Sequence, residues 1–226
     1  MKPRFDCSDP EARRRGLSAA QSAVQRGELV VLPTDTVYGV GADAFSPAAV
    51  QRLLDAKGRG RAMPPPVLVP EVRTLDGIAT SVPFAVRELI DAFWPGPLTI
   101  VCRAQPSLTW DLGDTHGTVA VRMPLHPVAL ELLDRTGPMA VSSANLSGQP
   151  AARTGQEAQE QLADSVAVYL DAGPAEHGEA STIVDATGEE LRVLRLGALS
   201  EQELRRVLPE GWAEPERRPV REGGGS

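Results

Sequence analysis

The segment covering residues 30–61 places the tightest constraint on the fold. Its apolar run Val30–Leu32 is ended by a proline, which is typical of a short buried strand. After a polar stretch, Ser46-Pro47 supplies an N-cap and the proline favoured at a first helical position, which predicts a helix over 46–57. A basic loop, 57–61, follows the helix. Because ligands of open α/β sheets bind at loops beyond the strand ends, we expect these two loops to border a site for a small anion.

The rest of the chain continues the alternation of strands and helices. Helical periodicity with capping or breaking residues predicts further helices over residues 9–26, 83–93, 126–135, 154–163 and 200–207. Apolar and β-branched runs predict further strands at 67–69, 98–102, 118–122, 139–141, 166–170, 181–185 and 191–195. A Thr187-Gly188 turn separates the last two strands, which indicates an antiparallel hairpin. The sum predicts an α/β fold with a twisted, mixed parallel/antiparallel sheet and helices on its faces.

Length and composition limit the domain count and the class of partner. A chain of 226 residues that is 42% hydrophobic suits one core, so we expect a single domain over residues 1–208. Residues 209–226 are charged and proline-bearing and end in glycines, which predicts a disordered tail. A formal net charge of −7 and an aromatic content of only 4% disfavour a surface for nucleic acid.

The cysteines and histidines show no metal-binding or disulfide spacing. Cys7 and Cys102 are far apart, which favours a reducing cytoplasm. The three histidines, His116, His126 and His177, lie next to turn residues, and we interpret them as surface residues. No apolar run reaches transmembrane length and no leader is evident, so we expect no membrane partner. The Walker loop, the GxGxxG fingerprint and the GxSxG elbow are also absent from the sequence.

Two residue types are so rare that their positions carry information. Lys2 and Lys57 are the only lysines among 23 basic residues, which leaves 21 arginines, and Asn145 is the only asparagine. The choice of a compact ammonium at position 57 favours a functional role, with chance as the alternative. Asn145 lies in a stretch of hydroxyl and amide side chains, 142–148, that can hold phosphate oxygens. The alternative is an ordinary serine-rich turn.

Seven short motifs closely resemble, in order, those of the YrdC-like threonylcarbamoyl-adenylate synthase family. They are PTDTVYG (33–39), KGR (57–59), WPGPLT (94–99), RMP (122–124), SANLSG (143–148), STIVD (181–185) and RLGA (195–198). The resemblance covers about residues 29–207, and an ordered series of this kind is specific. It implies a twisted α/β fold with a concave, positively charged groove. It also implies a reaction in which L-threonine, bicarbonate and ATP give threonylcarbamoyl-AMP and pyrophosphate. A tRNA threonylcarbamoyltransferase complex would use the product, with tRNA contact by this chain weak or indirect.

The resemblance also assigns roles to individual residues. The catalytic pair would be Lys57 and Arg59, which bind carbamate and phosphate oxygens. The ATP-binding residues would be Lys57, Arg59, Arg61, Thr118, Ser143, Asn145 and Arg195. The threonine-binding residues would be Thr34, Tyr38, Arg122 and Ser181. Mg²⁺ is expected with the triphosphate, held mainly by phosphate oxygens and water. Since the carbamate oxygen itself attacks the α-phosphorus, such a site works by positioning and electrostatics and needs no protein nucleophile.

Two positions depart from the family pattern. Met63 stands where a lysine or asparagine is common, and Leu68 stands where a histidine is common. We expect Arg61 to replace the lost cation. Two other functions compete with the synthase. A carbamoyl-adenylate-handling relative would carry acylphosphatase and zinc-finger segments, which the sequence lacks. An RNA-binding or ribosome-assembly factor using the same groove is disfavoured by the negative net charge.

Overall fold

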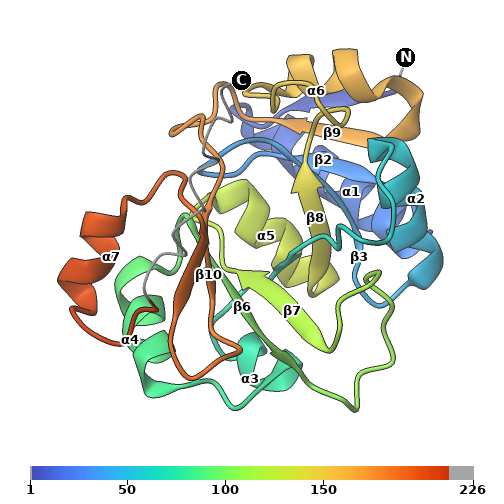
Figure 1. The fold of residues 1–226 in the computed structure, drawn as a ribbon. Coiled ribbons are helices and arrows are strands. Elements are labelled where there is room, and N and C mark those ends of the chain that lie inside the picture. The colour runs from blue at the N-terminus through green and yellow to red at the C-terminus, as the bar shows by residue number, and fades with distance from the viewer. Residues whose placement is uncertain (1, 214–226) are drawn as a thin grey trace, which may run out of the picture.

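The computed structural model describes residues 2–213, in which one mixed sheet is flanked by helices (Figure 1). Its strands are β1 (Arg4–Asp6), β2 (Val30–Leu32), β3 (Gly39–Asp43), β4 (Val67–Leu68), β5 (Ala79–Thr80), β6 (Leu98–Ala104), β7 (Thr118–Arg122), β8 (Met139–Ser143), β9 (Val168–Asp171), β10 (Thr182–Asp185) and β11 (Arg192–Arg195). The helices are α1 (Pro10–Gln25), α2 (Pro47–Lys57), α3 (Thr74–Ile78), α4 (Phe84–Phe93), α5 (Pro127–Thr136), α6 (Gly155–Leu162) and α7 (Glu201–Val207), with a 3-10 turn at Ala163–Ser165.

The strands are ordered β1-β9-β2-β3-β8-β4-β7-β6-β10-β11, with β5 beside β6. Both β1 and β2 run parallel to β9, and β4–β7 and β6–β10 are parallel pairs. The other neighbouring pairs are antiparallel, including the predicted β10–β11 hairpin. The mixed sheet predicted from the sequence is therefore confirmed.

Apolar side chains on the two faces of the sheet form two cores. Helices α1 and α5 lie together behind β2 and β8 in Figure 1 and bury Leu17 and Leu132 against Leu32. Val31, the neighbour of Leu32, belongs to the other core, to which α2, α4 and α7 contribute, and this is the alternation expected of a strand. Each fully buried side chain of the size of Leu17 contributes about 1.5–3 kcal/mol.

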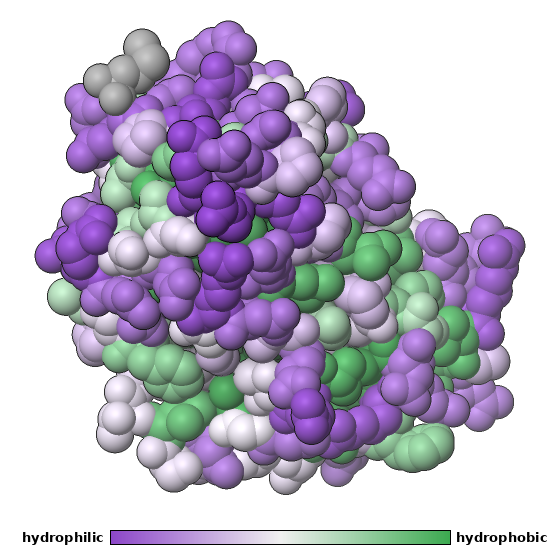
Figure 2. Space-filling view, turned by 180° about the vertical axis from the view of Figure 1, so that it is seen from behind, coloured by the Kyte–Doolittle hydropathy of each residue, from purple (hydrophilic) through white to green (hydrophobic). Residues whose placement is uncertain are grey.

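The surface is mainly hydrophilic in the view from behind. Figure 2 shows green, hydrophobic side chains gathering chiefly in the recess between the upper and lower parts of the molecule. Among residues 2–213, no helix is long and apolar enough to cross a bilayer.

All predicted helices and strands are present with small shifts of their ends. The polar stretch 34–43, which we expected to be a loop between β2 and α2, is not entirely a loop. Its second half is β3, and β1, β5 and α3 were also not predicted. β3 is not recognisable from the sequence pattern, because Gly39 and Gly41 have no side chains that could alternate between the two faces of the sheet. They are needed for close packing on β8: a Cβ on Gly39 would lie 2.6 Å from Val141 Cγ1, and one on Gly41 would lie 2.8 Å from Met139 Cε.

The folded unit extends beyond the predicted boundary at residue 208. The Leu191 N–H donates to Gly211 O at 2.8 Å, and the Ala213 N–H donates to Leu191 O at 2.8 Å. The side chain of Trp212 donates from Nε1 to Leu208 O at 2.7 Å. The predicted tail therefore begins too early, since its first residues pair with the chain at Leu191. Residues 214–226 lie outside the described part of the chain.

One histidine differs from the surface interpretation. His116 and His177 are exposed, but His126 is half-buried at the start of α5, where its Nδ1 accepts a hydrogen bond from the Val128 N–H at 3.2 Å. Burial lowers the pKa of His126, and the nearby Asp35 opposes that shift. His126 is therefore an N-cap.

Candidate active site

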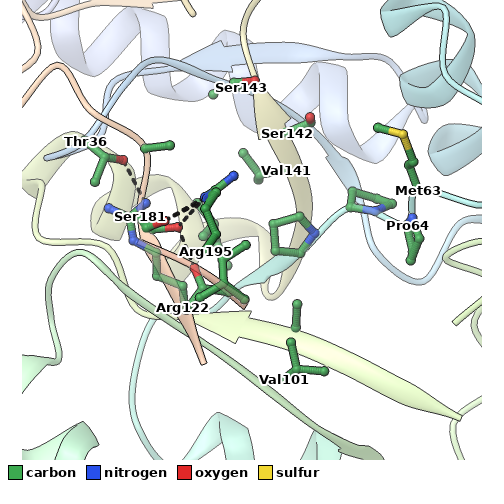
Figure 3. Close-up of a pocket in the computed structure, with 18 of the residues that line it drawn as sticks. Thr36, Met63, Pro64, Val101, Arg122, Val141, Ser142, Ser143, Ser181 and Arg195 are labelled. Carbon is green, nitrogen blue, oxygen red and sulfur yellow. Dashed lines mark hydrogen bonds between the residues drawn. The ribbon is translucent and has the colours of Figure 1, made fainter. Parts of the chain in front are cut away.

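A cavity of about 450 Å³ lies where the loops after β2 and α2 face the middle of the sheet (Figure 3). Its walls are Thr34, Thr36, Val37, Tyr38, Gly39, Arg59, Met63, Pro64, Pro65, Pro66, Leu68, Thr99, Val101, Leu112, Thr115, Thr118, Val119, Ala120, Arg122, Val141, Ser142, Ser143, Ala180, Ser181, Ile183, Leu194 and Arg195. No carboxylate is among these lining residues. In Figure 3, Thr36, Arg122, Ser181 and Arg195 gather at one end and Met63 and Pro64 at the other. The cavity thus has a polar, cationic end and an apolar end.

Arg122, at the end of β7, is the fixed point of the polar end. Its Nε donates to Gly96 O at 2.9 Å, its Nη1 donates to Thr36 Oγ1 at 2.8 Å, and its Nη2 donates to Asp35 Oδ1. A guanidinium has five N–H donors, so two remain for a ligand. Burial lowers the pKa of Arg122 and the Asp35 charge opposes this, but an arginine remains charged.

Asp35 is a buried counter-ion that does not line the cavity. Its side chain is 1% exposed in the ion pair with Arg122, and its Oδ1 also accepts the Leu125 N–H at 2.9 Å. Among the described residues, its Oδ2 is the only buried side-chain nitrogen or oxygen without a hydrogen-bond partner. The pair therefore holds the guanidinium in place, and breaking it would leave a buried charge unpaired.

Arg59 and Arg195 bring two more guanidiniums to the cavity, and within residues 2–213 neither forms an ion pair with a carboxylate. Arg59 donates to Ser142 Oγ at 3.2 Å, and Arg195 donates from Nη2 to Ser181 O at 2.7 Å. Burial lowers the pKa of Arg195, and the positive charge of Arg59 lowers it further. Two cations that repel each other beside a cavity without acidic residues create a site for an anion.

Lys57, at the C-terminus of α2, is 1% exposed and does not line the cavity. Its Nζ donates to Asn145 Oδ1 at 2.7 Å and to the backbone oxygens of Ser143 and Asn145. The three acceptors match the three N–H donors of an ammonium. Burial lowers the pKa of Lys57 to about 7, and the charge of Arg59 adds to the shift. Lys57 thus joins α2 to the loop after β8.

Asn145 completes this connection from the loop side. Its Nδ2 donates to Gln149 O at 2.6 Å and to Leu146 O at 3.0 Å, and the Ser147 N–H donates to Lys57 O at 3.2 Å. Like Lys57, Asn145 does not line the cavity. Both residues therefore hold the loop that follows Ser142 and Ser143, the last two residues of β8.

Eight of the eleven predicted site residues line the cavity. They are Thr34, Tyr38, Arg59, Thr118, Arg122, Ser143, Ser181 and Arg195. Lys57, Asn145 and Arg61 do not line it, and Arg61 does not replace a missing cation there. The guanidinium of Arg61 is exposed and pairs with Asp111 at 2.7 Å and Asp114 at 3.5 Å. Met63 and Leu68, the two residues that depart from the family pattern, instead contribute apolar side chains to the cavity wall.

Tyr38 needs a second correction. It belongs to the cavity wall, but its hydroxyl lies 2.6 Å from Gly173 O and 3.1 Å from Asp171 Oδ1. Because that hydroxyl is already bonded within the protein, it is not free to hold a threonine.

Sequence reasoning missed Thr36, Thr99 and Asp35, and it included Ser142 only within the stretch 142–148. Thr99 is buried, and its Oγ1 lies 2.8 Å from Ser181 Oγ, while Ser142 bonds to Arg59. The period of two along a strand would have placed Thr99 on the same face as Val101, but only the pairing of β6 with β10 shows that this face meets Ser181.

Comparisons with known proteins identify the family. The Sua5/YciO/YrdC family model, described as "Telomere recombination", matches residues 22–197. A protein of Mycobacterium tuberculosis strain H37Rv is 59% identical over 208 residues, which cover 92% of this chain and 96% of that protein. The threonylcarbamoyl-AMP synthase of Pyrococcus abyssi is 35% identical over 192 residues, which cover 84% of this chain and 56% of that protein.

A solved structure, P. abyssi Sua5 complexed with L-threonine, superimposes with a TM-score of 0.84 at 32% identity and covers 95% of this chain and 62% of that chain. This chain therefore spans less than two thirds of the length of the Pyrococcus protein. Since the family model matches most of the sequence and the fold is shared along nearly its whole described length, the chain belongs to the Sua5/YciO/YrdC family.

Proposed function

We propose that the protein is an L-threonylcarbamoyladenylate synthase, a nucleotidyltransferase that converts L-threonine, bicarbonate and ATP to threonylcarbamoyl-AMP and pyrophosphate. The observation that carries this proposal is the cavity itself, which has Arg59, Arg122 and Arg195 in its wall and no lining carboxylate. The carbamate formed from threonine and bicarbonate is an anion, as is ATP, and holding the two together requires such a site. The similarity to a protein complexed with L-threonine supports one of the three substrates.

The polar end of the cavity suits the amino acid. The two free N–H donors of Arg122 can hold a carboxylate, because a guanidinium and a carboxylate match in geometry. Ser181 and Thr34 supply hydroxyl groups beside it. The hydroxyl of Thr34 donates to Val37 O at 2.6 Å, accepts the Thr36 N–H at 3.2 Å and lies 2.9 Å from Thr36 Oγ1, so a substrate group would compete with these bonds for it.

The guanidiniums of Arg59 and Arg195 in the cavity wall suit the phosphates of ATP. Arg59 and Arg195 can neutralise negative charge there, and Ser143 can add a hydroxyl donor, whereas the Thr118 hydroxyl already donates to Thr115 O at 2.8 Å. The threonine amine combines with the carbon of bicarbonate, with loss of water, to give a carbamate. A carbamate oxygen then forms a bond to the α-phosphorus while the bond to the departing pyrophosphate breaks. The residues contribute position and charge stabilisation, and Lys57 supports them by holding the loop that follows Ser143.

Mg²⁺ would accompany ATP. Within residues 2–213 no group of three or more acidic, histidine or cysteine side chains could hold a metal ion. This fits an ion held by triphosphate oxygens and water, as Mg²⁺ bound to nucleotides commonly is. When bound, it would neutralise charge on the leaving pyrophosphate.

The product would pass to a tRNA threonylcarbamoyltransferase complex in the cytoplasm through transient contact. The net charge of −7 supports weak or indirect tRNA binding, since phosphate neutralisation dominates RNA affinity. Cys7 and Cys102 are free and buried, which fits a reducing compartment.

An omission series tests the proposal. Pyrophosphate release from ATP should require both threonine and bicarbonate. Arg122→Gln should abolish this threonine-dependent release. Release that continues without threonine would overturn the assignment. Tight tRNA binding that weakens steeply with salt, without ATP turnover, would favour an RNA-binding function instead.

A further inference from the structure

The segment that leads from β9 to Ser181, residues 172–180, crosses between the two halves of the sheet. It leaves β9, which pairs with β1 and β2, and enters β10, which pairs with β6 and β11. We call residues 172–180 the crossover. Its far end delivers Ser181 to the polar end of the cavity, so the place of this side chain depends on the path of the crossover.

The middle of the crossover is bonded to the backbone of the cavity loop. The His177 N–H donates to Asp35 O at 3.1 Å, and the Gly178 N–H donates to Thr36 O at 2.9 Å. Asp35 and Thr36 are the residues that hold Arg122. A displaced crossover would therefore disturb both Ser181 and the support of Arg122.

The first end of the crossover is held by the Tyr38 side chain. Its hydroxyl lies 2.6 Å from Gly173 O and accepts the Ala172 N–H at 2.9 Å. Burial raises the pKa of Tyr38, so the phenol keeps its proton and remains a donor at every ordinary pH. The backbone of Tyr38 is tied as well, since its carbonyl accepts the Ala144 N–H at 2.7 Å. One residue thus links the crossover to the loop after β8.

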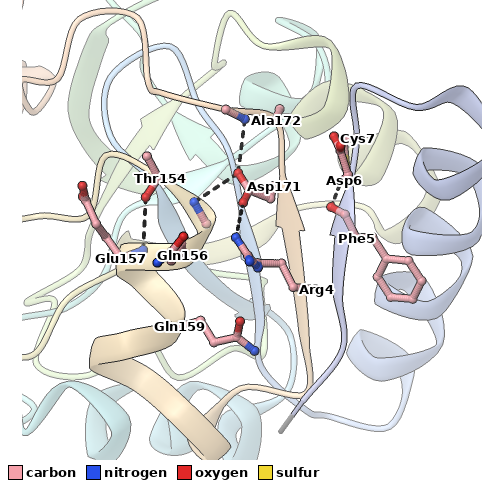
Figure 4. A network of polar contacts seen from close by, with 12 residues as sticks. Arg4, Phe5, Asp6, Cys7, Thr154, Gln156, Glu157, Gln159, Asp171 and Ala172 are labelled. Atoms are coloured by element: carbon pink, nitrogen blue, oxygen red, sulfur yellow. Dashed lines mark hydrogen bonds and ion pairs between the residues drawn. The ribbon is translucent and has the colours of Figure 1, made fainter.

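Asp171, the last residue of β9, completes the anchor (Figure 4). Its Oδ1 accepts the Gly173 N–H at 3.2 Å and the Gly155 N–H at 3.3 Å, and lies 3.1 Å from the Tyr38 hydroxyl. Its Oδ2 pairs with Arg4 Nη1 at 2.8 Å. The carboxylate therefore joins the crossover to β1 and to the N-terminus of α6, where a negative charge is favoured.

We propose that Tyr38 and Asp171 are positioning residues that fix the crossover and, through it, the threonine end of the cavity. The expected change in the KM for threonine rests on the proposed function. The positioning of the crossover by Tyr38 and Asp171 does not. The competing role is plain stability, in which the buried phenol contributes a hydrogen bond and nothing more.

The second tyrosine of the chain provides a matched control. Tyr169 is also buried, and its hydroxyl donates to a backbone carbonyl, Ala163 O, at 2.7 Å. Tyr38→Phe and Tyr169→Phe each remove one oxygen atom that donates to a backbone carbonyl, and Tyr38→Phe also leaves the Ala172 N–H without its acceptor. We expect Tyr38→Phe to lose somewhat more stability than Tyr169→Phe, and only Tyr38 touches the crossover.

The first measurement is hydrogen exchange of peptides that cover residues 172–180. We expect faster exchange of this segment in Tyr38→Phe and unchanged exchange there in Tyr169→Phe. Unchanged exchange in Tyr38→Phe would overturn the proposal. This readout requires no enzymatic activity, so it stands even if the proposed function fails.

The second measurement is steady-state kinetics of threonine-dependent pyrophosphate release. We expect Tyr38→Phe to raise the KM for threonine about five- to tenfold, as the loss of one buried hydrogen bond allows, with kcat within about twofold. Tyr169→Phe should leave the KM for threonine unchanged. Asp171→Ala should raise that KM as well, and the double variant should fall short of additivity because both residues hold one segment. An equal KM for threonine in the two phenylalanine variants would overturn the link from the crossover to Ser181. A wild-type protein without threonine-dependent pyrophosphate release would instead overturn the proposed function.

Discussion

The Nζ of Lys57 lies 2.7 Å from the Oδ1 of Asn145, so the only asparagine of the chain is bonded to its one buried lysine. Sequence reasoning found both residues unusual, each on its own. The structure shows that they form one unit, which ties α2 to the loop after β8.

Lys57→Arg should lose most of the activity. A planar guanidinium is larger than an ammonium and cannot meet three acceptors that converge on one nitrogen. We expect turnover to fall at least about tenfold and stability to fall by about 1–3 kcal/mol, the cost of unpaired buried acceptors. Pyrophosphate release and urea unfolding check this, with Arg52→Lys on the exposed face of α2 as the control. Near-normal turnover in Lys57→Arg would show that the choice of lysine is a compositional accident.

ATP binding should take up a proton at pH 8 but not at pH 6. The pKa of Lys57 is about 7 in the free protein, so at pH 8 the amine is mainly neutral and at pH 6 it is already charged. Phosphates bound nearby favour the charged form and raise its pKa, which requires uptake of a proton at pH 8 only. Calorimetry in two buffers of different ionisation enthalpy measures the uptake. The same uptake at pH 8 in Lys57→Met would contradict the assignment to this side chain.

Asp35→Asn should destabilise the protein strongly. It leaves the buried Arg122 charge without its counter-ion, which typically costs about 3–5 kcal/mol. The exposed Asp111–Arg61 pair offers the control, because Asp111→Asn should leave the urea midpoint unchanged. If both variants unfold at the wild-type midpoint, Arg122 does not depend on Asp35.

Truncation after Glu210 should lower the melting temperature more than truncation after Ala213. The shorter chain loses the two backbone hydrogen bonds to Leu191 and the packing of Trp212, together about 2–4 kcal/mol. Differential scanning calorimetry of the two truncated proteins beside the full chain provides the comparison. Equal melting temperatures in all three would restore the boundary at residue 208.

Much of the fold could be predicted because the sequence signals are local. Pro47 and Ser46 mark the start of α2, and the Thr187-Gly188 turn marks the β10–β11 hairpin. β3 could not be found in this way, since its glycines are explained only by the Val141 and Met139 side chains that they pack against.

The candidate site was predictable to the extent that charge and motif reveal it. The residues that line the cavity with cations were found, but a motif does not show where a side chain points. Lys57, Tyr38 and Arg61 were placed at the ligand from their motifs or loops, whereas each one is bonded to protein atoms. Asp35 was missed because its partner, Arg122, is distant in sequence and meets it only through tertiary packing.

The position of β9 between β1 and β2 has a consequence for the order of assembly. During synthesis, the first two strands exist long before β9 leaves the ribosome, and they must stay about two strand spacings apart, roughly 10 Å, to receive it. Direct pairing of β1 with β2 would be a kinetic trap. No amino-terminal fragment can complete the sheet, so the ligand site is assembled only when nearly the whole chain has been made, and a nascent chain is kept from consuming its substrates.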